Sequence, residues 1–232
     1  NQGWFGNADV AGGTEDRYMG RFMLNRFVDK TQVSVVGSAN NVNDQGFSGG
    51  GGPPRWRRNN GLTATKMLGV NFATQTDKLE LGGSARYNYQ DGDIASIGST
   101  EDFLPDGNSY SNSNSRQRNK AKNFNADFRM EWKPDSMTNI IFRPNFSYGK
   151  TDNLSNSESG TFNSDPYSLV SDPNNWLNLE KILNPDDDPL RSIRINAINS
   201  GSLNDNKSVS MDATLQLNRK LNDKGRNVTF RG

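Results

Sequence analysis

Apolar and polar residues alternate most regularly between residues 122 and 150. Apolar side chains occupy the even positions from Phe124 to Trp132 and from Ile140 to Tyr148, with charged or amide side chains at most positions between them. A period of two sends alternate side chains to opposite faces of a strand. Residues 133–136 separate the two segments and have the composition of a turn. This stretch therefore predicts a long β-hairpin with one apolar and one polar face.

Similar alternation predicts strands in the rest of the chain, and the connections between them fall into two kinds. Tight turns are expected around Asp29, Thr76, Pro134 and Asp223. Long polar loops are expected at 41–61, 91–119 and 151–206. In total the pattern predicts eight to nine antiparallel strands with short turns at one end and long loops at the other.

The strand lengths favour one fold class over another. About ten residues at ~3.3 Å each, tilted by ~45°, span roughly 23 Å, close to the ~25 Å apolar band of a membrane β-barrel. The short turns would then be periplasmic and the long loops extracellular. We therefore predict an up-and-down transmembrane β-barrel segment that spans residues 1–232. The alternative is a soluble β-sandwich, in which one face of each sheet packs inward and the other meets water.

The barrel interpretation assigns the two faces of the hairpin. The residues predicted to face lipid are Phe124, Phe128, Met130, Ile140, Phe142 and Phe146. The residues predicted to face a polar lumen are Arg86, Asp127, Arg129, Glu131, Arg143 and Asp212. Pro144 lies in mid-strand and cannot donate a ladder hydrogen bond, so we expect a β-bulge there.

Composition narrows the possible functions. Only 31% of the residues are hydrophobic, and the net charge of +1 does not indicate nucleic-acid binding. Cysteine and histidine are absent, which excludes disulfides, thiolate or imidazole metal sites and a histidine general base. The chain has no apolar run of the ~20 residues that a membrane helix needs, and no signal peptide at residue 1. We predict no catalytic group, metal or cofactor.

Candidate ligand contacts lie in the predicted loops. The aromatic and basic candidates are Arg55, Trp56, Arg57, Arg58, Tyr167 and Trp176. Arginines with an adjacent aromatic ring can bind an anionic ligand, although a solvated loop tip would have the same composition. Arg116, Arg118, Lys120 and Lys122 recur at every second position, and they either border lipid phosphates or are simply solvated.

Roughly the first ninety residues contain a series of short motifs: GGTEDRY at 12–18, NRF at 25–27, SVVG at 34–37, NNVN at 40–43, GFS at 46–48, NGL at 60–62 and GVNF at 69–72. Together these motifs resemble a known family, the outer-membrane β-barrel proteins of Bacteroidetes that are built like TonB-dependent receptors. The resemblance implies a plug domain ahead of a larger barrel, of which this chain would be the first part. A complete eight-stranded barrel is the alternative.

The expected function follows from the resemblance and the predicted fold together. We expect an outer-membrane receptor or transporter that binds or imports an unidentified nutrient, with outer-membrane lipid, a plug domain and a TonB complex as partners. One alternative is a surface adhesin or assembly component that transports nothing. Another is a soluble secreted binding domain.

Overall fold

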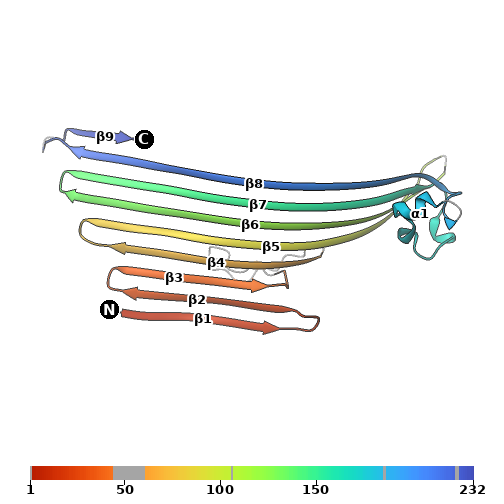
Figure 1. Ribbon diagram of the computed structural model, residues 1–232, viewed down its shortest axis with the longest axis horizontal. Coiled ribbons are helices and arrows are strands. Elements are labelled where there is room, and N and C mark those ends of the chain that lie inside the picture. The colour runs from red at the N-terminus through yellow and green to blue at the C-terminus, as the bar shows by residue number, and fades with distance from the viewer. Residues whose placement is uncertain (1, 44–60, 106, 185–186, 223–224) are drawn as a thin grey trace.

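The computed structural model describes residues 2–43, 61–105, 107–184, 187–222 and 225–232. These residues form one antiparallel sheet of nine strands, in which each strand pairs with its neighbours in sequence (Figure 1). The strands are β1 Gln2–Gly12, β2 Tyr18–Val28, β3 Thr31–Asn40, β4 Leu62–Gln75, β5 Leu79–Asp102, β6 Ser109–Asp135, β7 Thr138–Phe162, β8 Arg194–Lys220 and β9 Asn227–Arg231. The predicted all-β, up-and-down antiparallel order is therefore confirmed. The sheet is open, because β1 and β9 do not pair with each other.

The tight turns lie together at one end of the sheet. β2 and β3 are joined by Asp29 and Lys30, with Asp29 in the left-handed region at φ 49°. β4 and β5 are joined by residues 76–78, and β6 and β7 by Ser136 and Met137. The turn predicted at Asp223 lies outside the described residues, but Leu221 donates its backbone N–H to the carbonyl of Arg226, 2.8 Å away, and closes that hairpin.

Asp135 stabilises the β6–β7 turn, and this contribution should depend on pH. Its carboxylate accepts hydrogen bonds from the N–H of Met137 at 2.8 Å and the hydroxyl of Thr138 at 3.1 Å. These bonds hold the pKa of Asp135 below its usual value. Because the pKa is lower in the folded state, the stabilisation is complete at neutral pH and is lost as the pH falls through the usual aspartate range to the lowered pKa.

We therefore expect Asp135→Asn to unfold at a lower temperature than the wild type at neutral pH, and the two proteins to converge in strong acid. Thermal unfolding followed by circular dichroism at both pH values measures this difference. Asp77→Asn is the matched control in the neighbouring turn, since Asp77 forms only an exposed pair with Lys30 at 3.3 Å. A difference that persisted undiminished in acid would contradict the assignment.

One of the three predicted polar loops, 91–119, is largely strand, and a second, 151–206, is strand over a little under half of its length, which corrects the sequence-based prediction. β5 and β6 stay paired from Leu79–Trp132 out to Asp102–Ser109, and β7 and β8 stay paired as far as Phe162–Arg194. The predicted loop 91–119 is thus reduced to residues 103–108, and the loop 151–206 to residues 163–193. Both faces of these extensions are mainly polar, and their few apolar residues, such as Ile97, Ile198 and Leu203, do not alternate, so the period-two signal vanishes although the backbone ladder continues. The remaining predicted loop is 41–61, and most of it, residues 44–60, lies outside the described residues.

The segment between β7 and β8 folds into a small helical cap at the far end of the strand extensions (Figure 1). It contains η1 (Pro166–Ser168), η2 (Pro173–Trp176) and α1 (Leu179–Leu183). Asp165, Asp172 and Asn178 each accept a backbone N–H bond at the start of one of these turns. Phe162, Leu177 and Leu190 form the buried hydrophobic cluster beneath them. None of the helices in the described part of the chain is long and apolar enough to cross a membrane.

The β-bulge expected at Pro144 is not present. Pro144 lies opposite Ala213 in an unbroken β7–β8 register. On the β6 side the register is the same before and after it, from Asp127–Asn145 to Met130–Phe142, so no extra residue is inserted. The missing N–H of proline thus interrupts the ladder locally without bending the strand. The register shift of β6 lies nearer the turn, between Trp132 and Asp135.

Candidate functional site: an apolar band with a charged border

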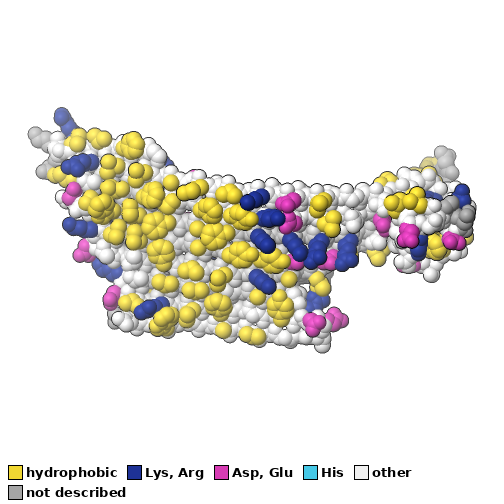
Figure 2. Space-filling view, in the orientation of Figure 1, with side chains coloured by type: hydrophobic (Ala, Val, Ile, Leu, Met, Phe, Trp, Pro, Cys, Tyr) yellow, Lys and Arg dark blue, Asp and Glu magenta, His cyan; other side chains and the backbone are white. Residues whose placement is uncertain are grey.

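One face of the sheet carries a continuous surface of apolar side chains, which we term the apolar band. Directly paired residues of neighbouring antiparallel strands lie on the same face. Through this register, most apolar residues of the nine strands share one face, where Figure 2 shows them gathered over the turn half of the sheet. Exceptions on the opposite face include Phe5, Met19, Met23, Phe27, Val36, Met67 and Ile141. On the longest strands the band comprises Leu79, Leu81, Gly83, Ala85 and Tyr87 of β5, Phe124, Ala126, Phe128, Met130 and Trp132 of β6, Ile140, Phe142, Pro144, Phe146 and Tyr148 of β7, and Val209, Met211, Ala213, Leu215 and Leu217 of β8.

The outer strands complete the band. They contribute Trp4, Gly6, Ala8 and Val10 of β1, Gly20, Phe22 and Leu24 of β2, Val33, Val35, Gly37 and Ala39 of β3, Leu68, Val70 and Phe72 of β4, and Val228 and Phe230 of β9. Gly37 has a packing role, because the ring of Phe22 occupies the space that a Cβ at position 37 would need. The six residues that the sequence analysis predicted to face lipid all lie on the band.

No other described segment covers the apolar band. Its side chains are open to solvent, including Leu68 at 49%, Val209 at 59% and Met211 at 78% exposure. Nine strands about 4.8 Å apart and five rows of side chains make the band on the order of 1,000 Å². Soluble monomers rarely expose contiguous apolar patches of more than a few hundred Å². The band therefore requires a covering that the described residues do not supply.

The opposite face of the sheet is mainly polar over β5 to β8 and carries ion pairs, whereas on β1 and β2 it also carries the stacked rings of Phe5 and Phe27, with centroids 5.5 Å apart. The register places Arg86, Asp127, Arg129, Glu131, Arg143 and Asp212 on this opposite face. Glu131 accepts hydrogen bonds from Arg129 at 2.9 Å and from Asn139 at 3.3 Å, and lies 3.1 Å from the ammonium of Lys133. Ser84 donates its hydroxyl proton to Asp127. Arg86, Arg143 and Asp212 form no ion pair with another described residue, so only part of the predicted set is brought together.

A row of lysines borders the apolar band on the side away from the tight turns. We term Lys66, Lys122, Lys150 and Lys207 the lysine row; they lie on the band's own face, on β4, β6, β7 and β8. Tyr89 of β5 occupies the same row, between Lys66 and Lys122. The ammonium of Lys66 lies 6.0 Å from the ring of Tyr89, and that of Lys207 lies 5.8 Å from the ring of Tyr148. The border thus combines tyrosine rings with cations.

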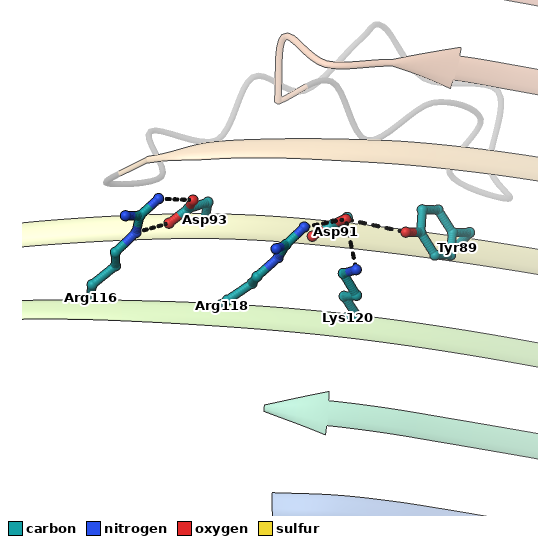
Figure 3. Close-up of polar contacts among 6 residues, drawn as sticks. All are labelled: Tyr89, Asp91, Asp93, Arg116, Arg118 and Lys120. Carbon is teal, nitrogen blue, oxygen red and sulfur yellow. Dashed lines mark hydrogen bonds and ion pairs between the residues drawn. The ribbon is translucent and has the colours of Figure 1, made fainter. Parts of the chain in front are cut away.

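Beyond the lysine row, β5 and β6 form a cluster of ion pairs on the same face (Figure 3). Arg116 binds both carboxylate oxygens of Asp93, at 2.6 and 3.0 Å. This bidentate pair, outside the apolar band, lowers the pKa of Asp93 and raises that of Arg116. Asp91 accepts a hydrogen bond from the hydroxyl of Tyr89 at 3.2 Å and lies 3.5 Å from Arg118 and 3.8 Å from Lys120.

The turn side of the band has a border of its own. Trp132 lies in the row of the band nearest the turns, opposite Ile140. Trp4 pairs with Arg26 near the turn ends of β1 and β2, and the guanidinium of Arg26 lies 5.0 Å from the ring of Trp4. Cations in or next to the turns follow, at Lys30, Lys78, Lys133, Arg219 and Lys220. The band is therefore bounded by aromatic rings and charges at both ends.

Only two of the six predicted ligand contacts lie among the described residues. Arg55, Trp56, Arg57 and Arg58 lie outside the described residues. Tyr167 and Trp176 both belong to the helical cap. Tyr167 accepts a hydrogen bond from the side-chain amide of Asn112 at 3.2 Å, and Trp176 packs against the buried cluster under the ammonium of Lys181. Both therefore have contacts that stabilise the cap.

Sequence reasoning missed two features of the structure. One is the buried ion pair of Asp188 with Arg194, which anchors the cap and has no local sequence signature. The other is the lysine row, whose members come from distant parts of the chain. The sequence contained a signal for this row, because Lys66 and Lys122 occupy the same alternating positions as the apolar residues of their strands. Only the strand register shows that these positions are neighbours.

Comparison of the chain with models of known protein families and with curated proteins returned no match. The function is therefore inferred from the geometry of the apolar band and of its borders.

Proposed function

We propose that the chain forms part of the wall of an outer-membrane β-barrel, with the apolar band against lipid and the opposite face toward a polar lumen. The observation that carries the proposal is the continuity of the band over all nine strands, bounded at both ends by aromatic rings and charges. From Leu79 to Tyr89 a strand rises about 33 Å, or about 23 Å across the membrane at a tilt of 45°, against the ~25 Å of outer-membrane barrels.

The open edges of the sheet support the same proposal. The outer edges of β1 and β9 pair with no other described strand, and a closed barrel would pair their backbone N–H and C=O groups with further strands. A soluble sandwich would instead need a second layer over the band, and none of the described segments provides one. The polar extensions of β5 to β8 would then project from the outer surface and hold the cap above it.

Within this proposal the protein is a receptor or transporter for an unidentified nutrient, similar to TonB-dependent receptors. The support is the resemblance of the motifs between residues 12 and 72, together with the polar face and its ion pairs. The main alternative is a surface adhesin that transports nothing. The projecting extensions and the cap favour this alternative, since they offer a protein-binding surface remote from a lumen. A plug domain and a TonB box in the full-length sequence would favour import.

We expect the full-length protein to sediment with the outer membrane and to be released by detergent but not by alkaline carbonate. Residues 1–232 expressed alone should aggregate without detergent, because the band and both sheet edges would meet water. Cell fractionation and size-exclusion chromatography measure these properties. A monodisperse, detergent-free monomer of either protein would count against a membrane wall.

A further inference from the structure

The lysine row places like charges side by side, which is unfavourable unless something neutralises them. Lys122 lies directly opposite Lys150, and Lys150 lies directly opposite Lys207. Like charges at directly paired positions destabilise a sheet. Lys150 has carboxylate partners, Asp152 at 3.3 Å and Asp205 at 3.6 Å. Within the described residues no carboxylate is in ion-pair distance of Lys66, Lys122 or Lys207.

The charged border as a whole has more cations than anions. Among the described strand residues on the face of the apolar band, the border contains the seven cations Lys66, Arg116, Arg118, Lys120, Lys122, Lys150 and Lys207, and the four carboxylates Asp91, Asp93, Asp152 and Asp205. The internal ion pairs therefore leave a surplus of positive charge. Strands about 4.8 Å apart spread the lysine row over about 19 Å, a width that several anionic groups could occupy side by side.

The position of these cations determines what kind of anion they can meet. Lysine stems can lie along apolar surface while the ammonium groups reach past its edge. The distances of Lys66 and Lys207 from the rings of Tyr89 and Tyr148 fit this arrangement. Tyrosine and lysine at the edge of an apolar membrane surface lie at the depth of lipid headgroups. The cations therefore stand where a lipid in contact with the band would place its phosphates.

A cavity of about 300 Å³ lies beyond the lysine row, two same-face positions farther along the strands, and combines cationic and apolar walls. It is lined by Asp93, Arg116, Arg118, Leu154 and Asn156. Although Arg116 is paired with Asp93, 71% of its side chain is exposed, and 55% of the side chain of Arg118 is exposed. Guanidinium groups bind phosphate through charge-assisted, often bidentate hydrogen bonds, and Leu154 offers apolar contact beside them.

We infer that the charged border, formed by the lysine row with Arg116, Arg118 and Lys120, binds the phosphate groups of anionic lipid in the leaflet that contacts this edge of the band. This inference rests on the membrane location proposed above. The ligand is a phosphorylated membrane lipid and not free phosphate, because the cations directly continue the surface that the acyl chains would cover. Bound phosphates would neutralise Lys66, Lys122 and Lys207 and remove the repulsion along the row.

The test compares lipid binding by the full-length protein and a triple variant, Lys66→Gln, Lys122→Gln and Lys207→Gln. The protein is reconstituted in phosphatidylcholine nanodiscs with or without diphosphorylated lipid A, and the bound lipid is counted by native mass spectrometry and titration. Each cation near an anionic membrane surface strengthens binding about fivefold, so the triple variant should bind lipid A roughly 100-fold more weakly. Removing both phosphates from the lipid should weaken wild-type binding similarly.

Two further variants separate the proposed contact from general effects of charge and folding. Lys30→Gln, Lys78→Gln and Lys220→Gln together remove the same charge from the turn side, and lipid A binding should remain within about twofold of wild type. Lys66→Arg, Lys122→Arg and Lys207→Arg keep the cations and should retain binding. Unchanged affinity in the Gln triple variant, equal loss in the turn-side variant, or competition by inorganic phosphate alone would each overturn the inference.

The two proposals fail in different ways. A full-length protein that never enters nanodiscs refutes the membrane wall and the lipid site together. A protein that inserts but binds phosphatidylcholine and lipid A equally well refutes the lipid-phosphate site alone.

Discussion

Met211→Arg is expected to destabilise the membrane-inserted protein by about 2–4 kcal/mol, as arginine near the middle of the lipid-facing side of a barrel does. Met211 lies one row from the middle of the apolar band, opposite Phe146, and 78% of it is exposed. If water covered the band, replacement of so exposed a side chain would change stability by no more than about 0.5 kcal/mol. The size of the destabilisation thus shows whether lipid or water meets the band.

Ser210→Arg is the matched control, because Ser210 is the preceding residue and points to the opposite face. It introduces the same side chain on the polar side, where we expect a change of about 0.5 kcal/mol or less. Denaturant titration after folding into lipid vesicles, with heat-modifiability on gels as a second readout, measures both variants. Equal stability of Met211→Arg and Ser210→Arg would refute a lipid-facing band.

The second large effect is expected in the cap, where Asp188→Ala should cost about 3–5 kcal/mol of local stability. The Asp188 side chain is 1% exposed and that of Arg194 is 9% exposed. Arg194 also donates a hydrogen bond to the backbone carbonyl of Trp176 at 3.1 Å, and its guanidinium lies 5.9 Å from the ring of Phe162. Removal of the carboxylate would leave a buried guanidinium without its counter-charge, and the cap would open.

Hydrogen exchange of residues 163–193 measures this effect locally, while β5 and β6 should keep their protection near the apolar band. Asp77→Asn breaks an exposed ion pair and should leave the hydrogen-exchange protection of the cap unchanged. The double variant Asp188→Leu with Arg194→Met should recover most of the lost stability, since apolar replacements of a buried pair are often neutral. If Asp188→Ala leaves cap exchange unchanged, the ion pair does not hold the cap.

Much of the strand pattern could be predicted from the sequence because it depends on local alternation. Residues two apart on one strand share a face whatever the partner strand is, so the apolar positions around Phe128 and Phe142 were assigned to one side correctly. The turns at Asp29, Thr76 and Ser136 were near their predicted places for a similar reason, since turn chemistry resides in a few neighbouring residues.

The strand ends could not be predicted in the same way. Beyond Asp93 on β5 and before Arg116 on β6 both faces meet water, so no alternation marks the strand, although the backbone ladder and contacts such as Ser96–Ser115 at 2.7 Å continue. We expected a bulge at Pro144 because the missing N–H of proline removes a ladder hydrogen bond, which an inserted residue can accommodate. The strand instead tolerates one gap, because its pairing with β8 is complete there.

The sequence by itself thus determined that this protein is built of strands with one apolar and one polar face, because that property is repeated within each strand. Only the tertiary structure decided which residues of different strands lie side by side. Register is a property of pairs of strands, and it aligns nine separate apolar stripes into one band. The same register brings Lys66, Lys122, Lys150 and Lys207, from positions far apart in the chain, into a single row at the edge of that band.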